Sequence, residues 1–356
     1  MELYDTVTML EGMKAQPPVR TFLRDRFFPF AGEKDCFATE KVLVDYEDEG
    51  SEKLAPAVVS GGINVQRNGF NTKEYTAPLI APQRTLTASQ LHSRTFNESP
   101  FGGMAPDKRE AIYLAGDLND LAKMIARTEE SMCAQILTEN KFAVKVFQND
   151  YATKAQEFKI EFFGEGKTAS EAVYAPENLW TVSGGDPLKD AYNMAKKLTD
   201  RGLPATTVIL GASAAEAFLK NEDLIKKLDN RRIQLTDMQR PQALENGAVW
   251  LGRYNCYGFN LDFFSYTASY TNDENKSVYY IPANKMIVTA EGIGKRAYGA
   301  ITQYEEGSDQ AHTYASDRVP QVTINRHDNI KEIKLQSRPL PMPNHINPFY
   351  VADVTA

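Results

Sequence analysis

The residue types that most often do chemistry are sparse and scattered in this sequence of 356 residues. Four histidines occur, each isolated in a polar or proline-rich segment: His92, His312, His327 and His345. Imidazoles that move protons or bind metals usually stand near other catalytic or ligating groups. Three cysteines occur at separations that match neither CxxC nor a metal-binding spacing: Cys36, Cys133 and Cys256. We therefore predict no metal site and no cofactor.

Sequence motifs for catalysis or nucleotide binding are absent as well. No HExxH, GxSxG or Walker pattern occurs, and Gly292-Ile293-Gly294 lacks the third glycine of a dinucleotide-binding loop. The turn Gly211-Ala212-Ser213 has one glycine and no lysine in register for a phosphate. We predict no catalytic residue, and a hydrolase that uses Ser213 or Cys256 is the third-ranked alternative.

Charge and hydropathy narrow the function further. The formal net charge is −7 without a dense Lys/Arg run, so a protein that grips nucleic acid is not expected. Two readings of this acidity stay open: it keeps the protein soluble, or it weakens attraction to a nearby polyanion.

The first ten residues lack a basic signal-peptide start, and no apolar stretch approaches the roughly 20 residues of a membrane span. We expect neither export nor membrane insertion, and the odd cysteine count favours a reducing cytosol.

The strongest element is a helix predicted over residues 107–140, about 50 Å long. Asp107 with Glu110 three residues later predicts its capped start, and Asn140 its end. Six apolar residues fall on one stripe of this helix: Leu114, Leu118, Leu121, Ile125, Met132 and Ile136. Strands are predicted at 142–147 and 158–163, and the glycines and prolines of 164–185 predict a domain boundary.

Two segments before this helix need another surface to rest on. Residues 1–39 combine prolines with phenylalanines, which fits either an arm lying on a neighbouring copy or a strap across its own domain. After a strand at 40–46, Asn68-Gly69 predicts a tight hairpin turn between arms 63–67 and 70–75. The arms are mostly polar, and a lone ribbon of this kind is marginal in water. A plain surface loop and an arm bound to a partner both remain open.

A second unit begins at Asp186-Pro187, an N-cap followed by proline in the first helical turn. We predict a helix to Gly202, a buried strand at 206–210, a helix opened by a capping box at Ser213, and a further helix at 221–228. Five strands are predicted next, followed by a strand-like tail from residue 332: 248–253, 257–265, 278–281, 285–289 and 296–302. Helices gathered at one end and strands at the other indicate an α+β fold.

Several segments, in order along the chain, resemble the lambda-type major head protein family of tailed phages, capsid protein E. They are TEKVLVDY (39–46), LAP (54–56), VSGG (59–62), EYTAPLIAP (74–82), VILG (208–211), LDNRR (228–232) and YIPANKM (280–286). Each segment is individually weak, and their ordered combination makes the resemblance specific. It covers residues 17–351 and implies an HK97-like phage capsid fold.

The resemblance implies a division of the chain into five parts. These are an N-terminal arm (1–39), strands with an extended loop (40–105, hairpin about 61–82), a peripheral domain (106–185) whose spine helix is 107–140, an axial domain (186–303), and a return to the peripheral domain (304–356). The function it implies is an icosahedral head subunit that self-assembles into a procapsid and mature shell around double-stranded DNA, in the virion and assembled in the host cytoplasm. An encapsulin-like compartment shell is the second-ranked alternative.

We expect the subunit to bind copies of itself in pentamers and hexamers, a separate scaffolding protein, a portal protein, in some cases a decoration protein, and packaged DNA without sequence specificity. Scaffold is expected to be separate because no fused segment fits before Thr39. A covalent cross-link from Lys73 to Asn344 or Asn347 is not predicted. Nine residues are predicted to make assembly contacts: Arg67, Asn68, Gly69, Phe70, Lys73, Glu74, Phe22, Phe27 and Phe28.

Overall fold

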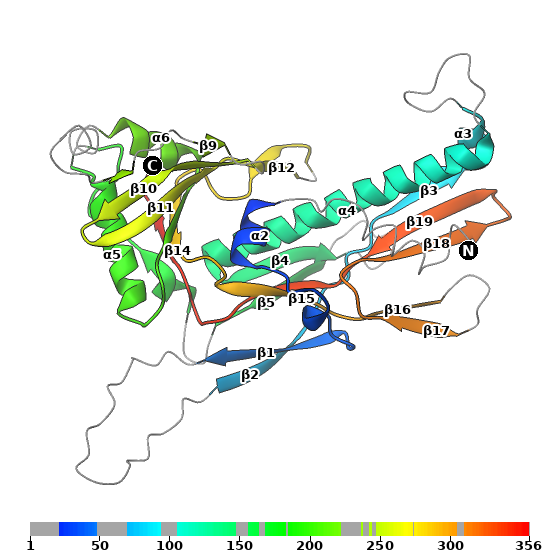
Figure 1. Cartoon of the computed structure of the whole chain (residues 1–356), viewed down its shortest axis with the longest axis horizontal. Coiled ribbons are helices and arrows are strands. Elements are labelled where there is room, and N and C mark those ends of the chain that lie inside the picture. Colours follow the sequence, from blue (N-terminus) through cyan, green and yellow to red (C-terminus); the bar gives the residue numbers. More distant parts are fainter. Residues whose placement is uncertain are drawn as a thin grey trace, which may run out of the picture.

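One long helix joins the parts of the molecule in the computed structural model (Figure 1). The structure describes residues 21–47, 70–93, 105–146, 156–163, 168–182, 184–221, 236–237, 242–243, 247–272, 274–304 and 310–355. Helix α4 (Pro106–Glu139) runs from a mixed sheet with two covering helices to a small sheet that lies along its other end. A two-stranded ribbon projects from the middle of the molecule.

Helix α4 confirms the predicted spine and corrects its start. All six residues of the predicted apolar stripe are buried. Asn140 ends the helix in a left-handed conformation (φ 53°), and its N–H donates to the Ile136 carbonyl oxygen. The N-cap is Ala105 and Pro106 fills the first helical position, so the predicted Asp107–Glu110 cap is wrong. Glu110 instead pairs with Lys331.

The first half of α4 lies on a three-stranded antiparallel sheet of β18 (Val319–Asn325), β19 (Ile330–Gln336) and β3 (Gln83–Thr87). Helix α3 (Ala88–His92) follows β3 directly. Leu114, Leu118, Leu121 and Ile125 pack with sheet residues in one apolar cluster, here called the distal cluster, completed by Val322, Ile333 and Leu335. The distal cluster therefore uses only the first part of the helix stripe.

The eight-stranded sheet forms the body at the other end of α4 (Figure 1). Its order is β6 (Val173–Tyr174), β21 (Tyr350–Asp353), β14 (Lys285–Thr289), β7 (Thr207–Leu210), β11 (Phe259–Tyr266), β10 (Ala248–Cys256) and β8 (Thr236–Asp237), with β9 (Gln242–Ala243) also on β10. Two of these contacts are parallel, β11 with β7 and β21 with β6, and the others are antiparallel. This mixed sheet agrees with the α+β prediction.

Helices α5 (Pro187–Thr199) and α6 (Ala212–Lys220) pack on this sheet through a second apolar cluster. Asp186 caps α5 as predicted, because its Oδ1 accepts from the N–H groups of Leu188 and Lys189. The capping box at Ser213 is wrong: Gly211 is the N-cap of α6. A Cβ at Gly211 would collide with the Pro282 carbonyl oxygen. Of the helix predicted at 221–228, only Asn221 is described, and it is the extended C-cap of α6.

The middle of the molecule holds the largest apolar cluster, here called the central cluster, to which the second half of α4 contributes. Around it lie α2 (Phe22–Phe27), a short 3₁₀ helix (Gly32–Asp35), the hairpin of β4 (Lys141–Val146) and β5 (Gln156–Glu161), and the pair β15 (Gly294–Tyr298) with β20 (Pro339–Pro343). Three smaller features complete the fold: the 3₁₀ helix Ala169–Ala172, the ribbon β12 (Ser269–Thr271)–β13 (Ser277–Tyr279), and the ribbon β16 (Ile301–Tyr304)–β17 (Ala311–Tyr314).

Strand β1 (Lys41–Glu47) pairs over its whole length with β2 (Phe70–Thr76), from Lys41 opposite Thr76 to Glu47 opposite Phe70. The predicted strand at 40–46 is thus confirmed. The hairpin was predicted between 63–67 and 70–75. Its second arm is β2, which pairs with β1. Its first arm and the Asn68-Gly69 turn lie outside the described residues.

The division of the chain differs from the predicted one at two places. The strand predicted at 296–302 is two strands, because the backbone leaves the β15–β20 pair at Gly299 and joins β17 from Ile301. The tail was expected to return to the peripheral domain, and β19 does lie along α4. Its last strand, β21, instead lies between β14 and β6 in the eight-stranded sheet. Residues outside 186–303 therefore complete that sheet.

Candidate assembly elements and their buried anchor

Helix α2, which lies within the predicted arm, is fixed to the spine helix by a buried carboxylate. The Glu130 Oε1 atom accepts from the N–H of Leu23 and its Oε2 from the N–H of Arg24, both at 2.9 Å. The Tyr266 hydroxyl of β11 donates to the same Oε1 at 2.6 Å. Glu130 thereby satisfies N–H groups that the first turn of α2 leaves without helical partners. The carboxylate joins α2, α4 and the eight-stranded sheet.

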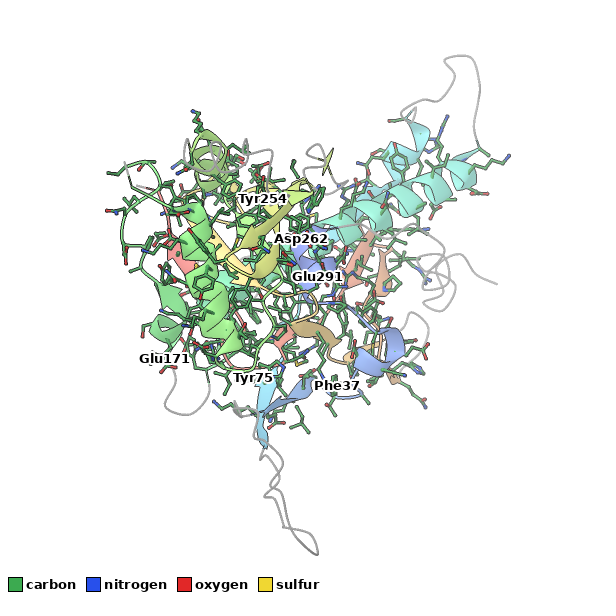
Figure 2. All side chains as sticks on the ribbon, turned by 60° about the vertical axis from the view of Figure 1, so that its left-hand side comes forward. Phe37, Tyr75, Glu171, Tyr254, Asp262 and Glu291 are labelled. Carbon is green, nitrogen blue, oxygen red and sulfur yellow. The ribbon has the colours of Figure 1, made fainter. Side chains whose placement is uncertain are left out.

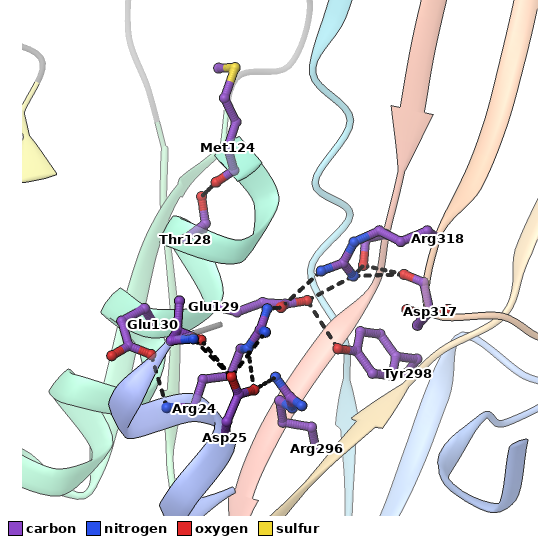
Figure 3. Close-up of polar contacts among 12 residues, drawn as sticks. Arg24, Asp25, Met124, Thr128, Glu129, Glu130, Arg296, Tyr298, Asp317 and Arg318 are labelled. Carbon is purple, nitrogen blue, oxygen red and sulfur yellow. Dashed lines mark hydrogen bonds and ion pairs between the residues drawn. The ribbon is translucent and has the colours of Figure 1, made fainter. Parts of the chain in front are cut away.

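The neighbouring carboxylate, Glu129, lies at the centre of a second set of contacts (Figure 3). The Arg318 guanidinium meets both of its oxygens, at 2.8 and 2.9 Å, and Arg24 Nη1 donates to Oε2 at 3.0 Å. The Tyr298 hydroxyl donates to Oε1 at 3.1 Å. The side chain of Glu129 is 0% exposed, against 8% for Arg24 and 12% for Arg318.

Asp25 extends this network to a third guanidinium. Its Oδ1 atom lies 3.0 Å from Arg24 Nε and 3.4 Å from Arg296 Nη1. The three arginines come from α2, β15 and the segment before β18, so the network ties the arm to strands far apart in sequence. We call Arg24, Asp25, Glu129, Arg296 and Arg318 the arm anchor. Asp25 is 38% exposed, but Glu129 and the three arginines are buried or nearly so, and the loss of a partner among these four is costly.

The two adjacent glutamates have opposite electrostatic environments. Burial opposes ionisation of Glu129, but the positive charges of Arg318 and Arg24 outweigh it and lower the pKa from 4.5 to about 2. Burial raises the pKa of Glu130, and the hydrogen bonds from Tyr266, Leu23 and Arg24 offset this only in part. Glu129 is therefore ionised throughout the neutral and mildly acidic range.

This difference predicts the response of the subunit to acid. The depressed pKa of Glu129 contributes stability that is present above about pH 4.5 and is lost as the pH falls toward about 2. The raised pKa of Glu130 acts in the opposite direction, because its ionised form is the one that burial disfavours. In a carbon-detected NMR titration of glutamate carboxyl groups, we expect Glu129 to stay ionised down to pH 3 and Glu130 to protonate first. Equal midpoints for the two groups would contradict the anchor geometry.

The predicted contact residues of the arm need a correction. Phe22, Phe27 and Phe28 are 4%, 0% and 0% exposed and belong to the subunit's own central cluster. The ring of Phe22 packs on Phe27, Phe264 and Tyr266. Side chains buried in this way offer no surface to a neighbour, so their assignment as assembly contacts is wrong. Of the two open readings, the strap across its own domain describes residues 21–39.

The β1–β2 ribbon is anchored at its base and on one face. Val42 and Val44 are buried in the central cluster. Lys73 Nζ donates to the Phe163 carbonyl oxygen at 2.9 Å, and the Tyr75 hydroxyl donates to the Glu161 carbonyl oxygen at 3.1 Å. Figure 2 shows Tyr75 where the ribbon meets the body. The backbone at the end of β5 thus fixes the direction in which the ribbon leaves.

The opposite face of the ribbon is exposed. Leu43 is 57% exposed, and beside it Lys41 pairs with Glu74 across the strands at 3.4 Å. Phe70 lies opposite Glu47 at the far end of the pairing. Of the predicted contact residues in the hairpin, Arg67, Asn68 and Gly69 lie outside the described residues. The contacts predicted for Phe70, Lys73 and Glu74 with a neighbour stay predictions.

The arm anchor was not predicted from the sequence, although one signal was present. The apolar stripe of α4 passes from Ile125 to Met132 without an apolar residue at the intervening position, which is Glu129. A helix position one turn after Ile125 faces the same side, so a buried acid there requires buried cations. Its partners Arg24, Arg296 and Arg318 are distant in sequence and carry no local signal.

The position of Cys256 does not favour its use as the nucleophile of a hydrolase. Burial raises the pKa of the Cys256 thiol to about 12, so its thiolate is scarce near neutral pH. Among the described residues, no group of three or more His, Cys, Asp or Glu side chains could hold a metal ion.

No helix within the described ranges is long and apolar enough to cross a membrane.

A family model for the phage major capsid protein E matches residues 5–354. The chain belongs to this family. The long spine helix, the projecting ribbon and the separate mixed sheet are thus the parts of a capsid subunit. No curated protein sequence matches the chain significantly.

Solved structures show the same fold. A protein described as a prophage capsid protein from E. coli CFT073 has a TM-score of 0.67 at 16% identity, with 100% of both chains covered. A phage-related protein from Bordetella bronchiseptica RB50 has a TM-score of 0.54 at 12% identity, covering 99% of this chain and 98% of that one. The encapsulin complex of Synechococcus elongatus PCC 7942 scores 0.43 at 10% identity, covering 100% and 96%, which is too distant to support an argument. This chain therefore has the HK97-like capsid fold and is a structural shell subunit of a phage head, a part of the virion.

Proposed function

We propose that this capsid subunit assembles through its ribbon and the connection at its tip, while the arm anchor keeps the ribbon's base rigid. The observation that supports this most is the register of β1 and β2. The two strands pair up to Glu47 and Phe70, and residues 48–69 connect them beyond the last pair. The base of the ribbon is fixed on the subunit itself, so the proposed contacts lie in 48–69, on the exposed face with Leu43 and Glu74, and at Phe70 and Lys73 further along β2.

Repeated contacts of this type build a closed shell. Each is heterologous, since a ribbon on one copy meets a different surface on the next. A subunit held at several places gains from the high effective concentration of its remaining contacts. Arg67, Asn68, Gly69, Phe70, Lys73 and Glu74 are the proposed contact residues, and the eight-stranded body is proposed to meet its copies around the pentamers and hexamers.

The test removes the connection and keeps the ribbon. Because Glu47 and Phe70 are directly opposite, an Asn-Gly turn can replace residues 48–69 and close β1 onto β2. We expect the unassembled variant to fold with a melting temperature within a few degrees of the parent, and to form no stable shells. Sedimentation and negative-stain microscopy, after coexpression with the neighbouring head genes, measure the result.

The β16–β17 ribbon provides the matched control. Tyr304 lies opposite Ala311, so an Asn-Gly turn in place of residues 305–310 closes a second ribbon in the same way. This variant is expected to assemble normally. Normal shells from the 48–69 replacement would refute the proposed role, and a failure of both variants would show that the assay responds to any shortened ribbon.

Further features of the proposed function concern partners. The subunit acts without catalysis and assembles in the host cytoplasm with a separate scaffolding protein and a portal protein. It encloses double-stranded DNA without reading its sequence. The net charge of −7 is consistent with an inner wall that does not hold the genome tightly.

A further inference from the structure

An open cavity of about 210 Å³ lies at the end of α4 that is remote from the eight-stranded sheet. Four aliphatic residues from four elements line it: Leu86 of β3, Leu91 of α3, Ile324 of β18 and Ile330 of β19. Contacts to α4 fix its place, since Arg109 Nη1 donates to the Leu91 carbonyl oxygen at 3.0 Å. An apolar cavity of about 150 Å³ can bind benzene, so this one has room for a large apolar side chain.

The charged residues that line the cavity are both cations. Arg326 and Lys331 are among its lining residues, and no acidic residue is. Lys331 is also paired with Glu110 of α4. A fitting ligand therefore combines apolar side chains for the floor with acidic groups near the rim.

We infer that this cavity binds residues 3–10 of the same subunit. That segment contains Leu3, Tyr4, Val7, Met9 and Leu10. Three acidic residues accompany them, Glu2, Asp5 and Glu11, and the first basic residue is Lys14. Its composition matches both the apolar floor and the basic rim of the cavity.

The length of the chain allows this contact within one subunit. Thr21 is the N-cap of α2, whose first turn is bound to Glu130, and the cavity lies beside Arg109 and Glu110 on the same unbroken helix. Twenty residues of helix correspond to about 30 Å. The eleven residues from Leu10 to Thr21 span up to about 36 Å when extended. The segment that continues the strap can thus reach the cavity along α4.

The experiment measures competition on the full-length, unassembled subunit. A fluorescent peptide with residues 1–16 is titrated against the parent and against the double variant Tyr4→Glu/Leu10→Glu, whose own segment is disabled. A tethered segment competes at an effective concentration on the order of a millimolar, so the parent is expected to bind the peptide at least about 10-fold more weakly than the double variant. The variant Thr6→Glu/Thr8→Glu, with the same charge change at polar positions, is expected to behave as the parent does.

Variants of the cavity locate the binding site. Added to the double variant, Leu91→Glu or Ala88→Trp is expected to lower peptide affinity at least about 10-fold, the first by charge and the second by filling the space. His92→Glu changes charge equally at an exposed residue that does not line the cavity, and is expected to have no effect. No peptide binding by the double variant, or equal binding by parent and double variant, would overturn the inference. Equal binding by the parent and the double variant would mean that a neighbouring copy or another protein occupies the cavity. Peptide binding is measured on unassembled subunits. A negative result would therefore count against this inference and not against the assembly role proposed for residues 48–69.

Discussion

Replacing Glu129 with glutamine is expected to destabilise the subunit by about 3–5 kcal/mol, because the change leaves two buried guanidiniums without their carboxylate. Arg24 and Arg318 both contact Glu129, and their side chains are only 8% and 12% exposed. A loss of this size is a large part of the stability of an ordinary domain. Urea unfolding of the unassembled subunit, followed by circular dichroism, measures it.

Glu139 is the matched control on the same helix. Its side chain is 56% exposed and pairs with Lys141 at the surface. Exposed pairs contribute about 0–1 kcal/mol, so Glu139→Gln is expected to change the free energy of unfolding little. Similar losses from the two variants would show that Glu129 has no special role in the arm anchor.

Truncation of Phe27 to alanine is expected to cost about 3–5 kcal/mol. The side chain is 0% exposed and packs in the central cluster, where its ring meets that of Phe22 edge to face. Part of the cost arises because the rigid surroundings, which include α4 and β11, cannot close the cavity that forms. Thermal melting measures the loss of stability. In limited proteolysis of the segment after Thr21, we expect the first cleavage to occur in α2.

An exposed aromatic residue controls for the loss of a ring. Tyr304 is 67% exposed, so Tyr304→Ala is expected to alter unfolding by less than about 0.5 kcal/mol. If Phe27→Ala were equally mild, the arm helix would have to be only loosely attached. Its hydrogen bonds to Glu130 and the ion pairs of the arm anchor would then hold it without help from the buried ring.

The periodic parts of the chain were predictable from sequence. The stripe from Leu114 to Ile136 predicted α4, since a helix places every third or fourth residue on one face. Strand β14 was predicted at its observed bounds, Lys285–Thr289, because a short β-branched run has one compatible structure. The resemblance to capsid protein E, now shown by the family match, supplied the fold that these elements form.

Features that depend on distant partners were not predictable. The phenylalanines of the arm could have faced a neighbour or their own core, and only the position of α4 and β11 decides between these. Strand β2 pairs with β1, where the partly buried Tyr75 lies opposite the buried Val42. Nothing local marks Arg296 and Arg318 as partners of Glu129. Side chains that meet only in the tertiary structure have no local sequence signal except an interruption of a periodic pattern. Here that interruption is Glu129 on the apolar stripe of α4.

Helix α4 spans both the distal and the central cluster without an internal proline, so the subunit contains a stiff strut. A force applied at the α3 end is transmitted along this strut to the network around Glu129 with little bending between them. Gly116 is the one glycine of this helix, and a methyl group there would meet no atom within 4 Å. A shell built from such struts would carry load along their length from the α3 end to the arm anchor.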